Sequence, residues 1–171
     1  MKKILGLVIS LTVISGVCAA VLAYVDSITK GPIAEMKVKQ EQAAVKVVLP
    51  AEAEKVESEN GFYVGRTAAG KVAGYAAKGT DAGGYGGDIT LMVGFKADKK
   101  TVECYKMLAA AETPGLGMKL TTPEFAGQFA GLDGTSLAVK KDGGTVEAIT
   151  SATITSRAVC RAIADAQKKL R

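Results

Sequence analysis

The chain begins with a long apolar segment. Ile4 to Tyr24 is a run of 21 residues without a charged side chain. At a helical rise of about 1.5 Å per residue, such a run spans roughly 30 Å, which is the thickness of the hydrocarbon core of a bilayer. The pattern therefore predicts a single transmembrane helix that anchors the chain in a cell (inner) membrane.

A cleaved signal peptide is the alternative interpretation of this segment. Cys18-Ala19-Ala20 and Val21-Leu22-Ala23 offer small residues of the kind that a signal peptidase accepts, and Cys18 gives the outline of a lipoprotein signal. However, the apolar region of a signal peptide usually has only about 7–15 residues. Val17 also occupies the position where a lipoprotein signal has a small residue. We therefore expect an uncleaved anchor.

Lysines on both flanks of the segment bear on its orientation. Lys2 and Lys3 precede it, whereas Lys30, Lys37 and Lys39 follow it. The positive-inside rule then gives only a weak preference, for a domain outside the cytoplasm.

The residues after the anchor change to a helical pattern. From Ile33 to about Leu49, apolar residues recur between charged and glutamine positions, which predicts a stalk helix after a break at Gly31-Pro32. The acidic stretch at 51–60 is expected to be a connection. These patterns predict three parts, listed by residue: a transmembrane anchor at 1–25, a stalk helix and linker at 26–60, and a folded domain at 61–171.

Short apolar runs bounded by turn residues follow, and they are typical of antiparallel strands. One hairpin is expected to turn at Ala69-Gly70, and a second across residues 96–100. A helix is expected to start with Pro123 in its first turn and to bury Phe125, Phe129 and Leu132. The strands that we expect are Phe62–Val64, Lys71–Ala77, Asp88–Phe95, Thr101–Leu108, Leu137–Lys140 and Thr145–Ile149.

The chain closes with a predicted amphipathic helix that starts at about Ser156. Val159, Ile163, Ala166 and Leu170 fall on one face of it, and basic residues occupy its last turn. Strands grouped together with helices at the ends argue for an α+β domain.

Composition narrows the chemistry that this domain can perform. The chain has no histidine, which excludes an imidazole base and histidine-ligated metal sites. Its three cysteines include no CxxC pair, so a zinc ribbon or an iron–sulfur cluster held by this chain alone is not expected. Cys104 and Cys160 could form a disulfide in an oxidising compartment, but we favour two buried free thiols.

The net charge of +5 is modest, and the basic residues gather beside the apolar segment and at the C-terminus. They do not alternate with aromatic residues, so the sequence gives no support for nucleic-acid binding. The first group suits lipid headgroups, and the second suits the last turn of a helix.

A cluster of hydroxyl residues precedes the final helix. Five of the seven residues from Thr150 to Ser156 are serine or threonine. Free N–H groups at a helix start, together with the positive end of the helix dipole, bind anions. Thr150, Ser151 or Thr155 could hydrogen-bond a phosphate there, and a threonine at this place could itself become the phosphate ester. The ordinary interpretation of such a cluster is a cap and turn.

Two glycine-rich stretches lie upstream of this cluster. Glu112–Gly117 has the sequence ETPGLG, and Gly84–Gly87 has the sequence GYGG. Each could be an ordinary tight turn, because proline and glycine favour turns. Two such loops together indicate a flat ligand that lies close to the backbone.

These motifs, taken in order, resemble a known family. GYGGDI at Gly84–Ile89, ETPGLG at Glu112–Gly117 and TSATITSRAV at Thr150–Val159 are similar to the G subunit of the Rnf ion-translocating electron-transport complex. The related C subunit of the sodium-translocating NADH:quinone reductase shares the FMN-binding domain. The resemblance covers nearly the whole chain, including the anchor.

The resemblance implies a covalently bound FMN. The family's signature is Ser/Thr-Gly-Ala-Thr, and its last threonine, here Thr153, carries FMN as a phosphoester. Ser151 stands where the family usually has glycine, and its Cβ would be unfavourable if φ were positive there. Glu147 stands where aspartate is common. The FMN-binding residues implied in this way are Tyr85, Glu112, Thr113, Leu116, Gly117, Thr150, Ser151, Ala152, Thr153 and Thr155.

The resemblance also implies partners and a role. The partners are the other subunits of an Rnf-type complex, the membrane, and a flavin transferase that uses FAD and Mg²⁺. The role is that of an electron-carrier subunit, not a complete enzyme by itself, in a complex that couples ferredoxin and NAD redox chemistry to ion movement. Electron relay requires no general acid or base, which agrees with the lack of histidine.

Two alternatives remain open at this point. The chain could be an anchored flavoprotein of another extracytoplasmic electron-transfer chain. It could also be a structural or binding subunit that never acquires flavin, an alternative for which Ser151 is the support.

Overall fold

The computed structural model describes residues 2–171, and it contains two compact units, one ending at Gln40 and the other comprising Glu41–Arg171. Helix α1 (Lys2–Val48) provides all of the first unit, and its last residues belong to the second. The predicted break at Gly31-Pro32 is wrong, because α1 continues through Pro32. Proline removes one backbone hydrogen bond, but its fixed φ of about −65° is helical. The helix-forming residues on both sides keep the helix intact.

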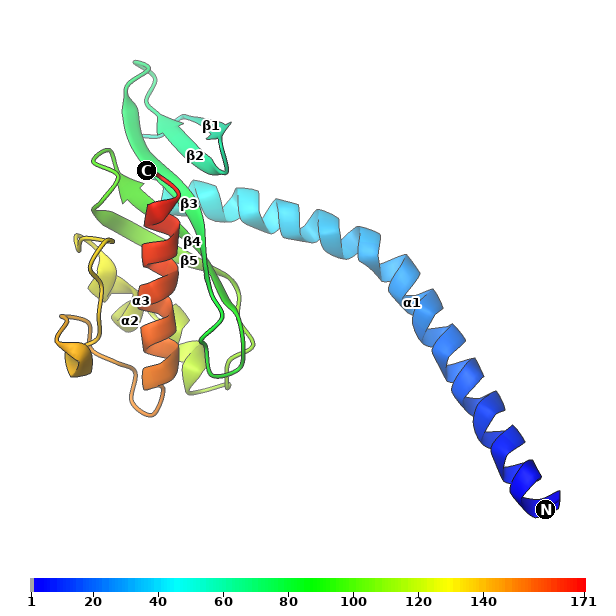
Figure 1. Ribbon diagram of the computed structural model, residues 1–171. Coiled ribbons are helices and arrows are strands. Elements are labelled where there is room, and N and C mark those ends of the chain that lie inside the picture. Colours follow the sequence, from blue (N-terminus) through cyan, green and yellow to red (C-terminus); the bar gives the residue numbers. More distant parts are fainter. Residues whose placement is uncertain (1) are drawn as a thin grey trace. The chain divides into compact units, whose positions relative to one another are not determined.

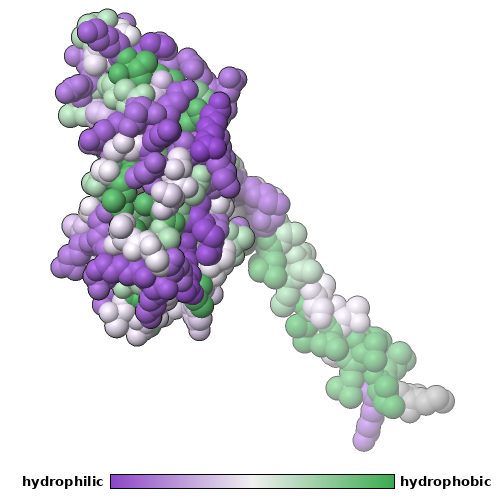
Figure 2. All heavy atoms as spheres, turned by 60° about the vertical axis from the view of Figure 1, so that its left-hand side comes forward, coloured by the Kyte–Doolittle hydropathy of each residue, from purple (hydrophilic) through white to green (hydrophobic). Residues whose placement is uncertain are grey.

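The first unit has the properties of a membrane anchor. Within the described residues, α1 is the one helix long and apolar enough to cross a membrane. Its apolar side chains are exposed along its whole apolar part, with Ile4 at 67% and Leu22 at 69%. Figure 2 shows them as a hydrophobic surface on this helix. Side chains of this kind are stable in a lipid environment, so the unit fits a single-pass anchor.

The second unit is built on one antiparallel sheet (Figure 1). Its strand order, β1-β2-β3-β4-β5, follows the sequence. The predicted hairpins are confirmed as β2–β3 and β4–β5, and the connection expected at 51–60 instead contains strand β1. All five residues of β1 are exposed, so it has no alternating apolar pattern. The strands are β1 (Lys55–Glu59), β2 (Phe62–Arg66), β3 (Val72–Asp81), β4 (Ile89–Lys96) and β5 (Val102–Ala109).

Helix α3 (Thr153–Lys168) covers one face of this sheet. Val159, Ile163 and Ala166 are buried against the sheet, as the sequence pattern predicted, and Leu170 after the helix is buried with them. The helix begins at Thr153, three residues before the predicted start. The first turn carries polar and β-branched residues, which hide the helical pattern there.

The other face of the sheet is covered by the last turns of α1. Because side chains alternate along a strand, β4 divides its residues between the two faces. Leu91, Val93 and Phe95 belong to the cluster under α3, whereas Met92 packs with Val45 and Val48 of α1.

The segment between β5 and α3 contains short helical elements. It starts with 3-10 helix η1 (Gly117–Thr121), and α2 (Pro123–Ala126) then begins at the predicted proline. The next elements are 3-10 helices η2 (Gly127–Phe129) and η3 (Lys140–Asp142). Phe125 and Phe129 are buried as predicted, and each packs edge-to-face on another aromatic ring. The prediction of one helix that also buries Leu132 is wrong, because α2 ends at Ala126 and Leu132 is half-buried in a bend.

The two strands predicted at 137–140 and 145–149 are wrong. The structure has a single parallel bridge there, between Val139 and Val146, and η3 lies between them. Both valines are buried. The apolar alternation therefore comes from two anchoring side chains in a loop, and not from a paired ladder.

The cysteines are free thiols. Cys160 is buried in the cluster under α3, and Cys104 is half-buried beside the end of α1. They lie on opposite faces of the sheet, so the free-thiol prediction holds for both, although Cys104 is not fully buried.

Candidate functional site

A cavity of about 460 Å³ lies where three segments meet. These segments are the glycine-rich loop between β3 and β4, the chain after β5, and the N-terminal turn of α3. Small-molecule sites typically measure about 300–1,000 Å³, so the cavity can hold a cofactor. It is lined by Tyr85, Glu112, Thr113, Leu116, Gly117, Ser151, Ala152, Thr153, Ile154 and Thr155.

The structure brings together all of the predicted site residues except one. Thr150 is exposed and is not part of the cavity lining. Ile154 lines the cavity but was not predicted. Its helical position could have identified it, because Ile154 is an apolar residue that does not fall on the buried face formed by Val159 and Ile163. In the structure it is 48% exposed.

The start of α3 leaves its first-turn N–H groups without a side-chain cap. The N-cap residue is Ala152, which makes no side-chain capping hydrogen bond to the first-turn N–H groups. The hydroxyl of Ser156 is used elsewhere: it donates to the carbonyl of Ala152 at 2.9 Å and accepts from the N–H of Ile149 at 2.9 Å. The hydroxyl cluster is therefore not a conventional cap. The first-turn N–H groups, which have no acceptor within the helix, can bind an anion in the cavity.

Thr153 is the first residue of this helix and is half-buried. Thr155, one residue beyond Ile154, is 1% exposed. Both threonines line the cavity, so two hydroxyl groups lie beside the uncapped helix start.

Ser151 has the backbone conformation that glycine would favour. Its φ is +63°, in the left-handed region. A Cβ in this region costs about 1 kcal/mol or more. The loop before α3 therefore keeps its turn with a serine, and its conformation is strained at this position.

Glu112 joins the two glycine-rich segments. It is only 7% exposed, and its Oε1 accepts a hydrogen bond from the backbone N–H of Tyr85 at 2.9 Å. Its Oε2 is buried and has no hydrogen-bond partner among the residues that the structure describes. A buried carboxyl oxygen without a donor is unfavourable, so a ligand that presents an N–H or O–H group there would be stabilised.

The arginines of α3 are engaged outside the cavity. Arg157 makes two hydrogen bonds to Asp142, at 2.7 and 2.6 Å, and these hold the pKa of that carboxyl below its usual value. Arg161 makes two hydrogen bonds of 2.8 Å to Asp81 and likewise lowers the pKa of that group. The residues that line the cavity include no lysine or arginine. Backbone N–H groups and hydroxyls are therefore the available partners for an anion.

Glu147, which departs from the family pattern, also lies outside the cavity lining. Its carboxylate accepts a hydrogen bond from Lys140 at 2.8 Å, which lowers its pKa. Within residues 2–171, no group of three or more cysteine, aspartate or glutamate side chains is arranged to hold a metal ion.

Comparison with known proteins identifies the same part of the chain. The FMN-binding domain family matches residues 84–168, which include every residue of the cavity lining. A curated relative, the G subunit of an ion-translocating oxidoreductase complex of Methanosarcina acetivorans, is 34% identical over 95% of this chain and 92% of its own length. The G subunit of the Na⁺-translocating ferredoxin:NAD⁺ oxidoreductase complex of Acetobacterium woodii is 33% identical over 92% of this chain and 87% of its own length.

Solved structures share the fold. The crystal structure of the C subunit of the Na⁺-translocating NADH-quinone reductase from Parabacteroides distasonis superposes with a TM-score of 0.53 at 26% identity. The superposed part is 63% of this chain and 59% of that protein, so this chain spans less than two thirds of the crystallised one. The predicted fold class, an apolar N-terminal helix followed by an antiparallel domain with a C-terminal helix, is confirmed.

Proposed function

Because this chain belongs to the family of G subunits of ion-translocating oxidoreductase complexes, we propose that it is a membrane-anchored electron carrier with one FMN, attached as a phosphoester to Thr153. When bound, FMN supplies one- and two-electron redox chemistry. One observation carries the proposal: Thr153 begins α3 at a helix end without a side-chain cap, and it lines the cavity.

The residues around the cavity fit the two ends of an FMN molecule. At one end, we expect the first-turn N–H groups of α3 and the hydroxyl residues Ser151 and Thr155, which line the cavity, to bind the phosphate on Thr153. At the other end, Tyr85 and Leu116 offer apolar surface. The free Oε2 of Glu112 and the hydroxyl of Thr113 offer hydrogen-bond partners for ring or ribityl groups.

The covalent attachment requires a second protein. We expect a flavin transferase that uses FAD and Mg²⁺ to transfer the FMN part of FAD to the chain. The Thr153 Oγ1 forms a new bond to the phosphorus of the FMN phosphate, the bond from that phosphorus to AMP breaks, and AMP and the hydroxyl proton are released. Two observations support Thr153 as the acceptor: it is half-buried, and it lines the cavity.

The chain's own residues then hold the flavin and control its surroundings. Glu112 and the glycine-rich segments fix one side of the cavity, and α3 fixes the other. The anchor keeps the carrier at the membrane, and we propose that the domain is extracytoplasmic. Its electron-transfer partners are the other subunits of an Rnf-type complex that couples ferredoxin and NAD chemistry to ion movement, as the names of the relatives indicate for those proteins.

Intact-mass measurement of the full-length chain, co-expressed with a flavin transferase and purified in detergent, tests the attachment. We expect the wild-type chain to gain the mass of FMN less one water and Thr153→Ala to lose this gain. Thr153→Ser, which keeps a hydroxyl, should retain at least part of it. Thr150→Ala is the matched control, because Thr150 lies in the same motif but outside the cavity, and it should remain modified.

The outcomes separate the alternatives. An unmodified wild-type chain, with the transferase active on another substrate, would contradict covalent attachment and favour a subunit that never acquires flavin. Modification that survives Thr153→Ala would move the site to another hydroxyl. Modified chain that co-purifies with none of the expected subunits would favour an anchored flavoprotein of another electron-transfer chain.

A further inference from the structure

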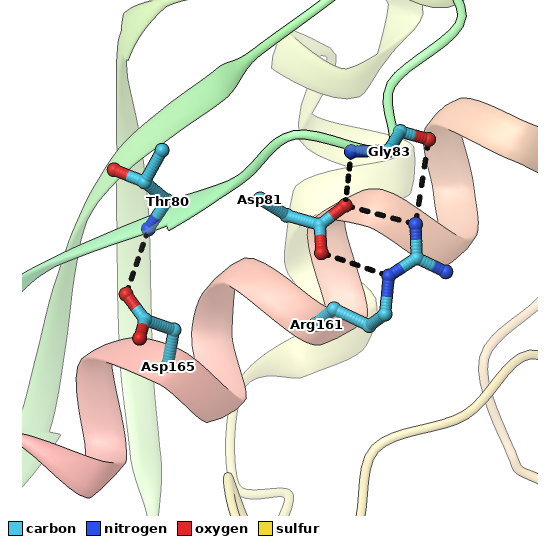
Figure 3. Close-up of polar contacts among 5 residues, drawn as sticks. All are labelled: Thr80, Asp81, Gly83, Arg161 and Asp165. Carbon is cyan, nitrogen blue, oxygen red and sulfur yellow. Dashed lines mark hydrogen bonds and ion pairs between the residues drawn. The ribbon is translucent and has the colours of Figure 1, made fainter.

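One side of β3 loses its strand partner halfway along. β2 pairs with β3 only as far as Ala77, and no strand within the described residues pairs with this edge beyond that point. Side chains of α3 take the place of a strand. Asp165 accepts a hydrogen bond from the backbone N–H of Thr80 at 3.0 Å (Figure 3), and Lys169 donates one to the carbonyl of Lys78 at 2.7 Å.

Arg161 continues this row where β3 ends. Its guanidinium donates two hydrogen bonds of 2.8 Å to Asp81 and a third, of 3.3 Å, to the carbonyl of Gly83 (Figure 3). Asp81 also accepts from the N–H of Gly83 at 2.8 Å. Arg161, Asp165 and Lys169 are spaced by four residues, so they lie along one side of the helix. Arg161 thus attaches the first residue of the glycine-rich loop 83–87 to α3.

The loop has a second attachment, to the segment that follows β5. Glu112 accepts from the N–H of Tyr85, and Gly86 lies directly against the carbonyl of Ala111, where a Cβ would come within 1.8 Å of the oxygen. Tyr85, whose N–H is part of the second attachment, has a 72% exposed side chain and lines the cavity. The side of the cavity that Tyr85 forms therefore depends on where both attachments hold the loop.

We infer that Arg161 is a positioning residue of the FMN site, which fixes the glycine-rich loop 83–87 relative to the helix start that carries Thr153. This inference rests on the proposed function. Thr153 and Arg161 lie on the same helix, eight residues or about 12 Å apart along its axis. A rigid helix held to the loop at Arg161 sets the distance between Tyr85 and Thr153, and so the space and polarity around the flavin.

Arg157 offers a matched control on the same helix. It forms a two-bond ion pair of the same kind with Asp142, and its side chain is 41% exposed compared with 49% for Arg161. Its partner lies in η3 and not in the glycine-rich loop. Loss of either arginine removes a similar ion pair, but only the loss of Arg161 releases the loop.

The test compares wild-type, Arg161→Gln, Arg161→Lys and Arg157→Gln full-length chains, purified in detergent after co-expression with the transferase. The readouts are amide hydrogen exchange at residues 83–87, the visible spectrum and midpoint potential of the FMN, and the melting temperature. We expect Arg161→Gln to speed exchange in the loop about fivefold and to shift the spectrum or potential. Arg157→Gln should leave loop exchange and the flavin spectrum and potential unchanged. It should lower the melting temperature by less than Arg161→Gln, because Asp142 is more exposed than Asp81 (39% compared with 17%).

Arg161→Lys should fall between wild-type and Arg161→Gln, because lysine keeps the charge but cannot make the two-bond contact. If Arg161→Gln does not fold, Asp81→Asn removes the same ion pair from the loop side and is judged by the same readouts. Loop exchange and flavin properties of the Arg161 variants that match those of Arg157→Gln would overturn the inference.

A wild-type chain without FMN would contradict the proposed function by itself. Hydrogen exchange on that flavin-free chain would then decide the inference. Faster exchange in Arg161→Gln would support the attachment of the loop by Arg161, and unchanged exchange would overturn it.

Discussion

The two faces of the sheet differ in the size of the hydrophobic cluster that covers them and in the segments that pack there. The face under α3 carries a large cluster that includes Phe95, Phe129 and Ile163, each of them fully buried. The face under the last turns of α1 carries a small cluster around Met92 and Val48. The cavity is built from segments that pack with the large cluster. The cavity that we propose as the FMN site thus lies on the side with the larger hydrophobic cluster.

Both faces bring a helix backbone close to the sheet through a glycine. A Cβ at Gly79 would come within 1.9 Å of the carbonyl oxygen of Ala162 in α3. A Cβ at Gly94 would come within 1.9 Å of the carbonyl oxygen of Val48 in α1. The two contacts are equally tight, so the two faces can be compared with the same substitution.

The largest difference is expected between Gly79→Ala and Gly94→Ala. Gly79→Ala must displace α3, which contributes six buried residues to the large cluster, and we expect it to lower the free energy of unfolding by about 3 kcal/mol or more. Gly94→Ala displaces only the end of α1 and should cost about 1–2 kcal/mol. Urea denaturation of the full-length chain in detergent, followed by circular dichroism, measures both. Equal losses of unfolding free energy in the two variants would contradict the expected difference between the two faces.

A smaller effect is expected from the two cysteines of the domain. Burial raises the pKa of Cys160, under α3, to about 11, and it also raises the pKa of Cys104, on the other face. Folding therefore favours the neutral thiol. Its contribution to stability is complete below the ordinary pKa of about 9 and is lost as the pH rises from 9 to 11.

We expect the free energy of unfolding to fall by up to about 2 kcal/mol over this range because of Cys160. Urea denaturation at pH 8, 9, 10 and 11 should show a shallower fall in Cys160→Ala, and a smaller change of slope in Cys104→Ala. At pH 8, a maleimide should also modify Cys104 before Cys160. Equal slopes, or earlier modification of Cys160, would contradict the deeper burial of Cys160.

The smallest effect is expected at two of the three turns in which a residue other than glycine has a positive φ. Ser151, beside the site, has a φ of +63°, and Asn60, in the hairpin of β1 and β2, has a φ of +43°. Asparagine tolerates this region better than serine. We expect Ser151→Gly to raise the free energy of unfolding by about 0.5 kcal/mol and Asn60→Gly to change it by less. The same denaturation experiment measures both, and a loss in Ser151→Gly would show that its side chain stabilises the turn.

Much of the site could be predicted from the sequence because its residues lie in short motifs. Glu112, Thr113 and Gly117 lie in one stretch and Ser151, Thr153 and Thr155 in another, so local order was sufficient. Arg161 could not be found in this way. Its contact with Asp81 joins residues 80 positions apart, and neither residue is part of a glycine-rich motif.

The fold was predictable where a strand is a continuous apolar run bounded by turn residues. β4 is buried along nearly its whole length and was expected within one residue of its observed ends. β1 is exposed along its length and was missed. Strands were wrongly predicted around Val139 and Val146, because two buried valines in a loop give the same apolar pattern as short strands. The continuous α1 was missed because the first turn of a new helix and a proline inside a longer helix look alike in sequence.

The unpaired edge of β3 has a consequence for the solubility of the domain. A row of free backbone N–H and C=O groups on a strand is a template on which another chain can add a strand and start aggregation. Here Asp165 and Lys169 occupy the groups of Thr80 and Lys78, and charged side chains cannot continue a sheet. In the folded domain, α3 and Lys169 therefore block this part of the β3 edge against edge-to-edge association.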